Sequence, residues 1–261
     1  MQVGLASDPG RVRERNEDAV FFWQCTLMHQ GQPPLPLGLF AVADGMGGQA
    51  EGEKASSLAV RLAAQHVIQR ICLPFLDDAV ADRPPINQVL ESGVYIAHQA
   101  LLRHLPDAGT TLTMALVLGD YLSIAHIGDC RAYLGERGRL RCLTQDHSLA
   151  ARLIEMGQGT AEEVASQRHL LYKALGQSPE VEPDIVHQPM GEGQYLLLCS
   201  DGLWSMVSEE QMTAIIEAAP TLTGACQELV NQANQQGGDD NISVILTAKH
   251  WPLPASPSTS S

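Results

Sequence analysis

Lysine is scarce in this chain of 261 residues, where only Lys54, Lys173 and Lys249 occur. None of them follows a glycine, so the Gly-Lys pair with which a P-loop cradles phosphates is missing. Acidic residues outnumber basic ones by 30 to 16, and the formal net charge is −14. The composition therefore excludes nucleotide binding through a P-loop. It also disfavours nucleic acid and anionic membranes as partners.

Cysteine patterns that carry chemistry are missing too. No two cysteines form a C-x-x-C pair, which argues against a disulfide framework and a structural zinc site. No arginine stands six positions after any cysteine, so the phosphate-binding loop of cysteine-based phosphatases is absent. A thiolate mechanism thereby loses its main support. The cysteines are Cys25, Cys72, Cys130, Cys142, Cys199 and Cys226.

Long hydrophobic runs and internal repeats are absent as well. Hydrophobic residues make up 44% of the chain, enough for a substantial core, yet no stretch reaches membrane-spanning length. Residues 1–10 contain no basic region followed by an apolar run, so we expect no signal peptide and a cytoplasmic protein. Residues 1–249 are predicted to form one domain, and residues 250–261 a disordered Pro/Ser-rich tail.

Short apolar runs bounded by turn residues predict nine strands, whereas helical spacing of apolar residues predicts four main helices. The strands are expected in consecutive groups, which favours an α+β fold with antiparallel sheets over a doubly wound parallel sheet. Nine strands favour two sheets packed face to face with helices outside. The predicted strands are 3–7, 19–26, 37–43, 111–118, 121–127, 130–135, 184–189, 194–199 and 242–248. The predicted helices lie around 60–71, 90–101, 208–218 and 222–236, with short ones at 147–157 and 161–166.

Four aspartates stand at the ends of strongly apolar runs. Asp44 and Asp201 each follow such a run and precede a glycine, Asp129 follows the run 124–127, and Asp240 precedes the run 242–246. Taken singly, each is explained equally well as a turn, because Asp and Gly favour turns by their own chemistry. Strands packed in one core bring their ends together, however, and clustered carboxylates resist ionisation unless a cation lies among them.

Carboxylates without imidazole or thiolate suit hard ions such as Mg²⁺ or Mn²⁺. A shared carboxylate can bridge two such ions, as in two-metal hydrolases. The neighbouring glycines leave backbone carbonyls open to coordinate a cation, and the Gly45 carbonyl is the candidate.

The charged segment 11–18 adds groups that suit phosphate. Its guanidinium groups favour bidentate phosphate binding, and Glu17 with Asp18 could orient metal-bound water. The competing interpretation is a charged surface turn before the strand at residue 19.

Together these segments resemble the metal-dependent type 2C serine/threonine protein phosphatases in their compact bacterial form. The matching motifs span nearly the whole chain in the family's order. They are R-x-x-N-E-D at 13–18, DGMGG at 44–48, G-T-T at 109–111, H-I-G-D at 126–129, D-H at 146–147, S-D-G at 200–202 and G-x-D-N at 238–241.

The resemblance implies two packed antiparallel sheets sandwiched between pairs of helices (α-β-β-α), with a small flap at 147–176. It also implies two ions, Mn²⁺ or Mg²⁺, and a third, weaker ion. In that assignment Asp44 bridges the two ions, and Asp44 and Asp18 are catalytic together with Arg13, which binds the substrate phosphate. Arg11 and Arg15 remain alternatives to Arg13.

The remaining implied ligands fall into two groups. Those that contact an ion directly are Asp44, the Gly45 carbonyl, Asp129, Asp201 and Asp240, with Asp129 and Asp201 holding the third ion. Those that lie beyond the direct ligands and act through bound water or by position are Glu17, Asp18 and Asn241.

The chain departs from many relatives in one respect. Where they carry a histidine in or just after the glycine-rich motif, this sequence has Met46 and Gln49, which deliver no proton at physiological pH. His147 is predicted to orient a loop, and His126 to lie in the core. The flap residues Arg152, Arg168 and His169 do not identify a substrate, and a surface loop without a specific role remains an alternative.

The predicted activity is hydrolysis of phosphoserine and phosphothreonine in proteins by a metal-activated water, without a phosphoenzyme. The expected substrates are proteins phosphorylated by a bacterial serine/threonine kinase, and the expected state is a monomer. A broad small-molecule phosphomonoesterase is the alternative enzyme. A catalytically silent relative that binds a partner is the non-enzymatic alternative.

Overall fold

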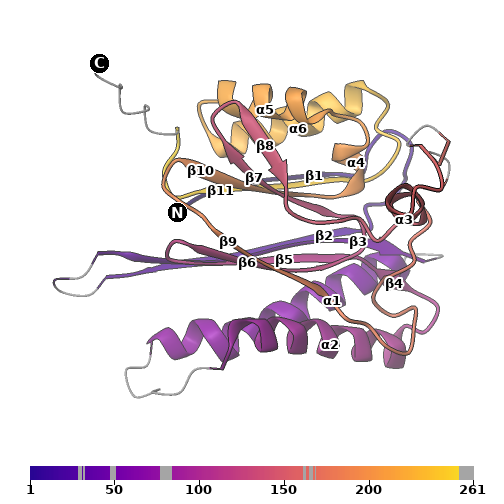
Figure 1. Cartoon of the computed structure of the whole chain (residues 1–261), viewed down its shortest axis with the longest axis horizontal. Coiled ribbons are helices and arrows are strands. Elements are labelled where there is room, and N and C mark those ends of the chain that lie inside the picture. Colours follow the sequence, from indigo (N-terminus) through magenta and orange to yellow (C-terminus); the bar gives the residue numbers. More distant parts are fainter. Residues whose placement is uncertain are drawn as a thin grey trace.

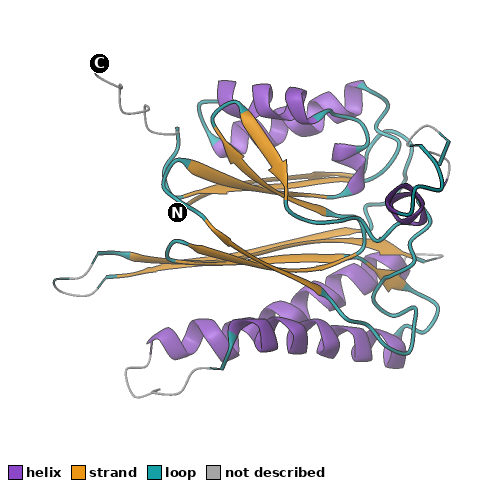
Figure 2. Ribbon diagram, viewed as in Figure 1, coloured by secondary structure: helices purple, strands orange, loops and turns teal. Residues whose placement is uncertain are grey.

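A computed structural model of the chain contains two antiparallel sheets that lie face to face, each covered on its outer side by helices (Figures 1 and 2). The structure describes residues 1–28, 31, 33–47, 51–76, 84–160, 163–164, 167 and 169–252. This four-layer arrangement confirms the predicted α-β-β-α architecture.

The first sheet has the order β1-β11-β10-β7-β8 and the second β2-β3-β5-β6-β9, with β4 paired to β3. All of their strand pairs are antiparallel. The first sheet consists of β1 (Gln2–Asp8), β11 (Ile242–Ala248), β10 (Gln194–Cys199), β7 (Arg131–Glu136) and β8 (Arg139–Cys142). The second consists of β2 (Asp18–Leu27), β3 (Leu35–Met46), β4 (Gly109–Thr110), β5 (Leu112–Leu118), β6 (Tyr121–Ile127) and β9 (Asp184–Pro189).

The helices flank this pair of sheets. On the second sheet lie α1 (Glu51–Val67), which continues into a π-helix (Ile68–Cys72) and a 3₁₀-helix (Leu73–Leu76), and α2 (Ile86–His104). On the first sheet lie α5 (Glu209–Ala218) and α6 (Leu222–Gln235). Two short helices, α3 (Leu149–Glu155) and α4 (Asp201–Trp204), stand at the edge where the flap lies (Figure 1).

Three apolar clusters fill the three interfaces between these layers. One contains Leu90 of α2 beneath the second sheet, one contains Phe40 between the sheets, and one contains Leu229 of α6 above the first sheet. The central strands therefore bury both faces, which explains why their sequences are nearly continuous apolar runs.

Two strands and one helix were missed by the sequence analysis. The strands β4 and β8 span only two and four residues, too short for a periodic pattern. The helix α4 is a single turn that directly follows β10. The predicted helix 161–166 falls mostly outside the described residues, and the two described positions, Glu163 and Val164, form a turn.

The C-terminal boundary also differs from the prediction of a tail that begins at residue 250. The Trp251 side chain is buried, its ring packs edge to face on Tyr195, and its Nε1–H donates to the Ala219 carbonyl at 3.1 Å. The packed core therefore continues to Trp251, because an indole supplies a large apolar surface and one N–H that needs a partner. Residues 253–261 lie outside the described part. No helix in the described ranges is long and apolar enough to cross a membrane.

Candidate active site

The strand ends named in the sequence analysis meet at one edge of the paired sheets. Asp18 opens β2 and stands directly opposite Asp44, near the end of β3. Asp129 lies in the turn between β6 and β7, Asp201 begins α4, and Asp240 precedes β11. Tertiary structure thus collects five carboxylates from five places in the chain.

Asp44 lies at the centre of this acidic cluster. Its amide donates to Thr111 Oγ1 at 2.8 Å, and its carbonyl accepts from Thr110 Oγ1 at 2.8 Å and from the Thr111 amide at 2.9 Å. These threonines belong to the G-T-T motif, which therefore fixes the backbone of Asp44. Burial raises the pKa of the Asp44 carboxyl well above its ordinary value. The negative charges of Asp18, Asp201, Asp129 and Asp240 add to that effect.

The other buried carboxylates respond in the same way. Burial raises the pKa of Asp18 to about 7, against which Ser243 and Ser200 act by hydrogen bonding, with Ser200 Oγ–H donating to Asp18 Oδ2 at 2.7 Å. Burial raises the pKa of Asp201 to about 6, and it raises that of Asp129 well above its usual range. Ionising all of them together is therefore unfavourable unless positive charge enters.

Two of these carboxyl groups leave an oxygen without a partner. Asp18 Oδ1 and Asp201 Oδ1 are buried and accept no hydrogen bond. Buried polar atoms are almost always paired, and an unpaired one at a functional site points to an absent ion or water. The donor set is oxygen alone, which fits Mg²⁺ or Mn²⁺.

The side chains are not arranged as a finished ligand set. Within the described ranges, no group of three or more His, Cys, Asp and Glu side chains is placed to hold a metal ion. Some of their oxygens are engaged by donors of the chain itself, Ser200 on Asp18 and Arg13 on Asp240. A cation bound among these carboxylates would compete with these two donors.

A second oxygen-rich spot lies where the first turn of α1 meets the end of β3. A Cβ atom built on Gly52 would stand 2.8 Å from Glu17 Oε2 and 2.9 Å from the Gly45 carbonyl oxygen. Both oxygens thus converge on one small space that only a glycine leaves open. Burial raises the pKa of Glu17, as expected for a carboxylate among other acids.

Arg13 reaches the cluster from the loop before β2. Its Nη2 lies 2.8 Å from Asp240 Oδ2, and this carboxylate raises the pKa of Arg13. The Arg13 side chain is 54% exposed, so the guanidinium stands at the mouth of the site and reaches solvent. Among the described residues, neither Arg11 nor Arg15 forms an ion pair with a carboxylate of the cluster.

Asn241 is buried and anchors the Arg13 loop. Its Nδ2 donates to the carbonyls of Pro9 and Arg15 at 2.9 and 2.8 Å, and its Oδ1 accepts from the Glu17 amide at 2.7 Å. The Asn241 side chain therefore uses its hydrogen-bonding groups on backbone atoms of the loop. It positions Arg13 and Glu17 relative to Asp240.

Trp204 connects the turn that carries Asp129 to the helix α4, which begins at Asp201. The sequence analysis did not identify this residue. Its Nε1–H donates to the Asp129 carbonyl at 2.9 Å, while its backbone belongs to α4, which begins at Asp201. The Arg131 guanidinium stacks 3.6 Å above its ring and also forms two hydrogen bonds with Asp146, at 2.9 and 2.7 Å. The only hint in the sequence is that Trp204 follows the S-D-G motif by two residues.

The histidines have other partners. His147 Nδ1 accepts from the Gly128 amide at 3.0 Å, and its Nε2 faces Asp184 at 3.2 Å, so it supports the turn before Asp129. His126 bonds Thr113 Oγ1 and the Gln145 carbonyl inside the core. Burial lowers the pKa of both, that of His126 to about 3, which favours their neutral forms. Met46 pairs with Gly109, and Gln49 and Arg168 lie outside the described residues.

Comparison with known proteins gives consistent matches. The family profile for protein phosphatase 2C matches residues 12–246. The serine/threonine phosphatase stp of Listeria monocytogenes is 34% identical over 252 residues, which cover 95% of this chain and 96% of that protein. The crystal structure of the Mycobacterium tuberculosis serine/threonine phosphatase PstP/Ppp is 34% identical with a TM-score of 0.77, and the match covers 95% of this chain and 99% of that one. A structure of the PstP catalytic domain in complex with two manganese ions is 32% identical with a TM-score of 0.74, and covers 94% and 96% of the two chains.

Proposed function

The chain belongs to the protein phosphatase 2C family, and from that premise we propose that its acidic cluster is the metal site at which a protein phosphate ester is hydrolysed. The enzyme is a protein-serine/threonine phosphatase, as are the relatives to which nearly its whole length is similar. Its cofactors are two Mn²⁺ or Mg²⁺ ions, the number held by the related PstP catalytic domain. The observation that carries the assignment of residues is the set of buried carboxylates with unpaired oxygens and raised pKa values.

In this proposal Asp44, Asp201, Asp240 and the Gly45 carbonyl would be the direct ligands of the two ions, and Asp44 would contribute to both sites. Asp129 and Asp201 would hold a third ion, and Glu17 and Asp18 would act through bound water. When bound, the ions generate a nucleophile from water at neutral pH and offset charge on the phosphate. This chemistry needs no phosphoenzyme.

The chain's own groups orient the substrate. Among the described residues, the Arg13 side chain is paired only with Asp240, so its guanidinium can turn to two phosphate oxygens. The loop around it stays anchored meanwhile, because Asn241 bonds the carbonyls of Pro9 and Arg15. A guanidinium fits phosphate in this bidentate manner and stabilises charge on the equatorial oxygens. Neither His147 nor His126 is placed to protonate the leaving alkoxide, because both are buried and bonded elsewhere.

The test is Mn²⁺-dependent hydrolysis of a phosphothreonine peptide and of an aryl phosphate. Asp44→Asn and Asp240→Asn should each lower kcat by roughly 100-fold or more, since each removes a charge from the metal site. Asp239→Asn is the matched control, because this exposed neighbour of Asp240 should leave kcat unchanged. Equal activity in EDTA, or in both site variants, contradicts the assignment. Activity on the aryl ester alone indicates a small-molecule phosphomonoesterase.

Arg13→Ala tests phosphate binding separately. Loss of a charge-assisted hydrogen-bond pair of roughly 1.5–3 kcal/mol should lower kcat/KM by about 10-fold to 100-fold. Arg11→Ala and Arg15→Ala are the comparisons. If either of these lowers kcat/KM while Arg13→Ala does not, the phosphate ligand has been assigned to the wrong arginine.

We propose further that the substrates are proteins phosphorylated by a bacterial serine/threonine kinase, and that the enzyme acts as a cytoplasmic monomer without nucleic-acid or membrane partners. The net charge of −14 supports the absence of polyanionic partners. The six free cysteines, all within the described ranges, support a reducing compartment. The flap at 147–176, which is tied to the turn before Asp129 through His147, is proposed to influence substrate choice.

A further inference from the structure

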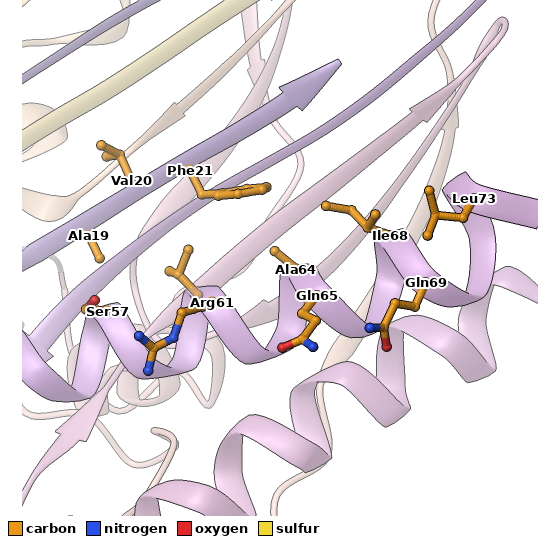
Figure 3. A pocket seen from close by; sticks show the side chains of 11 residues that line it. Ala19, Val20, Phe21, Ser57, Arg61, Ala64, Gln65, Ile68, Gln69 and Leu73 are labelled. Carbon is orange, nitrogen blue, oxygen red and sulfur yellow. The ribbon is translucent and has the colours of Figure 1, made fainter. Parts of the chain in front are cut away.

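An apolar groove runs between β2 and α1, beside the acidic site. It has a volume of about 590 Å³, and Val60 belongs to its apolar lining. The other apolar side chains that line it include Phe21, Ala64, Ile68 and Leu73 (Figure 3). Exposed polar side chains of α1, among them Arg61 and Gln65, stand along its outer rim. Leu73 is 48% exposed, so apolar surface continues out of the groove.

One wall of this groove is a free sheet edge. In the described part of the chain, β2 pairs only with β3, in one unbroken register from Asp18 opposite Asp44 to Leu27 opposite Leu35. Proteins usually protect such edges with a bulge, proline, lysine or a short strand. Residues 19–27 contain none of the protective residue types, and the strand is ten residues long. A full row of backbone donors and acceptors therefore faces outward beside an apolar groove.

Side chains of β2 point alternately to its two faces, and this pattern defines what could fill the groove. Ala19, Phe21 and Trp23 pack with the α1 side, whereas Val20 packs between the sheets. A strand added to β2 would obey the same alternation, because successive side chains point to opposite faces of a sheet. Every second side chain of the added strand would enter the groove against α1.

The charge around the groove is unusual for this protein. Residues 54–76, which form most of α1 and the two helices after it, contain no acidic residue, although the chain has 30 of them. Among the described residues, Arg61 is the only charged one that lines the groove, and it forms no ion pair with any other of them. The groove thus offers an unpaired cation on an otherwise acidic molecule.

We propose that the β2–α1 groove binds an extended segment of a partner protein, which adds as a strand to β2. On the face that it turns to α1, this segment carries apolar side chains that fill the groove and an acidic side chain that meets Arg61 at the rim. Strand addition supplies backbone hydrogen bonds, and the groove selects the alternate side chains. A second copy of this chain is the poorer occupant, because residues 19–27 carry no acid to meet Arg61 and each copy has a net charge of −14. The groove ends at Ala19 and Ser57, next to the site residues Asp18 and Glu17, so a bound segment would lie beside the catalytic centre.

The probe is a phage-displayed library of random twelve-residue peptides, panned on the metal-free wild-type protein. We expect enriched peptides with apolar residues at every second position and an acidic residue in the same alternate series, because Arg61 lines the same side of the groove. Their affinity, measured by fluorescence anisotropy, should fall roughly 3-fold to 10-fold in Arg61→Glu and in Gln65→Glu. The first change replaces attraction at the exposed rim by repulsion, and the second adds repulsion there. Arg103→Glu on α2, an exposed site elsewhere, is the matched control and should leave the affinity unchanged.

Backbone methylation of an enriched peptide tests the strand itself. In an added strand, every second backbone amide of the peptide should face β2, and the amides between them should face away. N-methylation of the amides that face β2 should weaken binding about 10-fold, whereas N-methylation of the others should weaken it much less. Hydrogen exchange of residues 19–27 should slow when the peptide binds. The proposal is overturned if no peptide is enriched, if Arg61→Glu and Arg103→Glu bind equally well, or if both methylated sets bind alike. None of these measurements depends on phosphatase activity.

Discussion

At the residue scale, the acidic site is held in place by uncharged neighbours. Thr110 and Thr111 fix the backbone of Asp44, Ser200 bonds Asp18, and Trp204 bonds the carbonyl of Asp129. Carboxylates that repel one another need such support, because their charges alone would drive them apart. Trp204 is the most informative of these groups, since a single N–H links α4 to the turn that carries Asp129.

Trp204→Phe keeps an aromatic ring under Arg131 but removes the donor to Asp129. We expect a loss of about 1 kcal/mol in the free energy of unfolding and a several-fold rise in the Mn²⁺ concentration needed for half-maximal activity. Calorimetric Mn²⁺ binding gives the second measurement. Trp23→Phe, the same change on β2, is the control and should leave the Mn²⁺ dependence alone. If Trp204→Phe lowers stability without affecting Mn²⁺ binding, its contact with Asp129 is only structural.

At the element scale, the site depends on how closely the first turn of α1 approaches the end of β3. A Cβ atom on Gly45 would stand 2.1 Å from the Gly52 carbonyl oxygen, so the two segments pack backbone to backbone. Glycine is ordinarily unfavourable inside a helix, by up to about 1 kcal/mol relative to alanine. Its presence at position 52 therefore reflects a steric requirement of the site and not a helical preference.

Gly52→Ala should displace the Glu17 carboxylate and the Gly45 carbonyl, since the new methyl group would lie within 3 Å of both. We expect kcat/KM to fall roughly 10-fold or more and Mn²⁺ binding to weaken, although alanine favours the helix. Gly224→Ala, near the start of α6, is the matched control, because its closest neighbour is only the Thr221 hydroxyl. Equal behaviour of the two variants would contradict the steric explanation.

At the scale of the whole molecule, the three apolar clusters stabilise a fold that gathers acidic groups at one edge. Asp18 and Asp201 have pKa values of about 7 and about 6 in the folded protein, against an ordinary value of 3.8. Between pH 3.8 and 7 the metal-free folded protein therefore binds protons that the unfolded chain has lost. Its stability must fall as pH rises through this window.

The metal-free enzyme should accordingly melt several degrees lower at pH 7.5 than at pH 5, because each 1 kcal/mol shifts Tm by roughly 2–4 °C at this size. Saturating Mn²⁺ should raise Tm more at pH 7.5 than at pH 5, since protons compete with the ion. Asp18→Asn should flatten the pH dependence of the metal-free protein, whereas Asp239→Asn should not. A pH dependence of Tm identical in wild type and Asp18→Asn would argue against the raised pKa of Asp18.

The C-terminal end of the domain gives a second prediction at this scale. Trp251→Ala removes a buried ring and its hydrogen bond to Ala219, so we expect a loss of roughly 3–5 kcal/mol in the free energy of unfolding. A chain ended after Pro252 should unfold like the full chain in denaturant. A chain ended after Lys249 should be destabilised as Trp251→Ala is; equal stability of both truncations would place Trp251 outside the cooperative core.

The sequence by itself determined the layered α+β fold, most strand positions and the acidic residues at the strand ends. These follow from local patterns, namely apolar periodicity, turn residues and the order of motifs along the chain. It did not reveal β4, β8 or α4, which are too short for a pattern, or the core position of Trp251, which depends on contacts with Tyr195 and Ala219. The Pro/Ser-rich composition of residues 250–261 instead predicted a disordered tail that includes Trp251.

Only the tertiary structure decided which groups surround the aspartates that the sequence had marked. Asp18 lies opposite Asp44 through the register of two strands, Trp204 meets Asp129 across 75 positions, and Asn241 meets Arg15 across 226. Such partners are set by the packing of the whole chain, and no local pattern encodes them. The β2–α1 groove is likewise a property of packing, because an edge strand is recognised only when the order of the sheet is known.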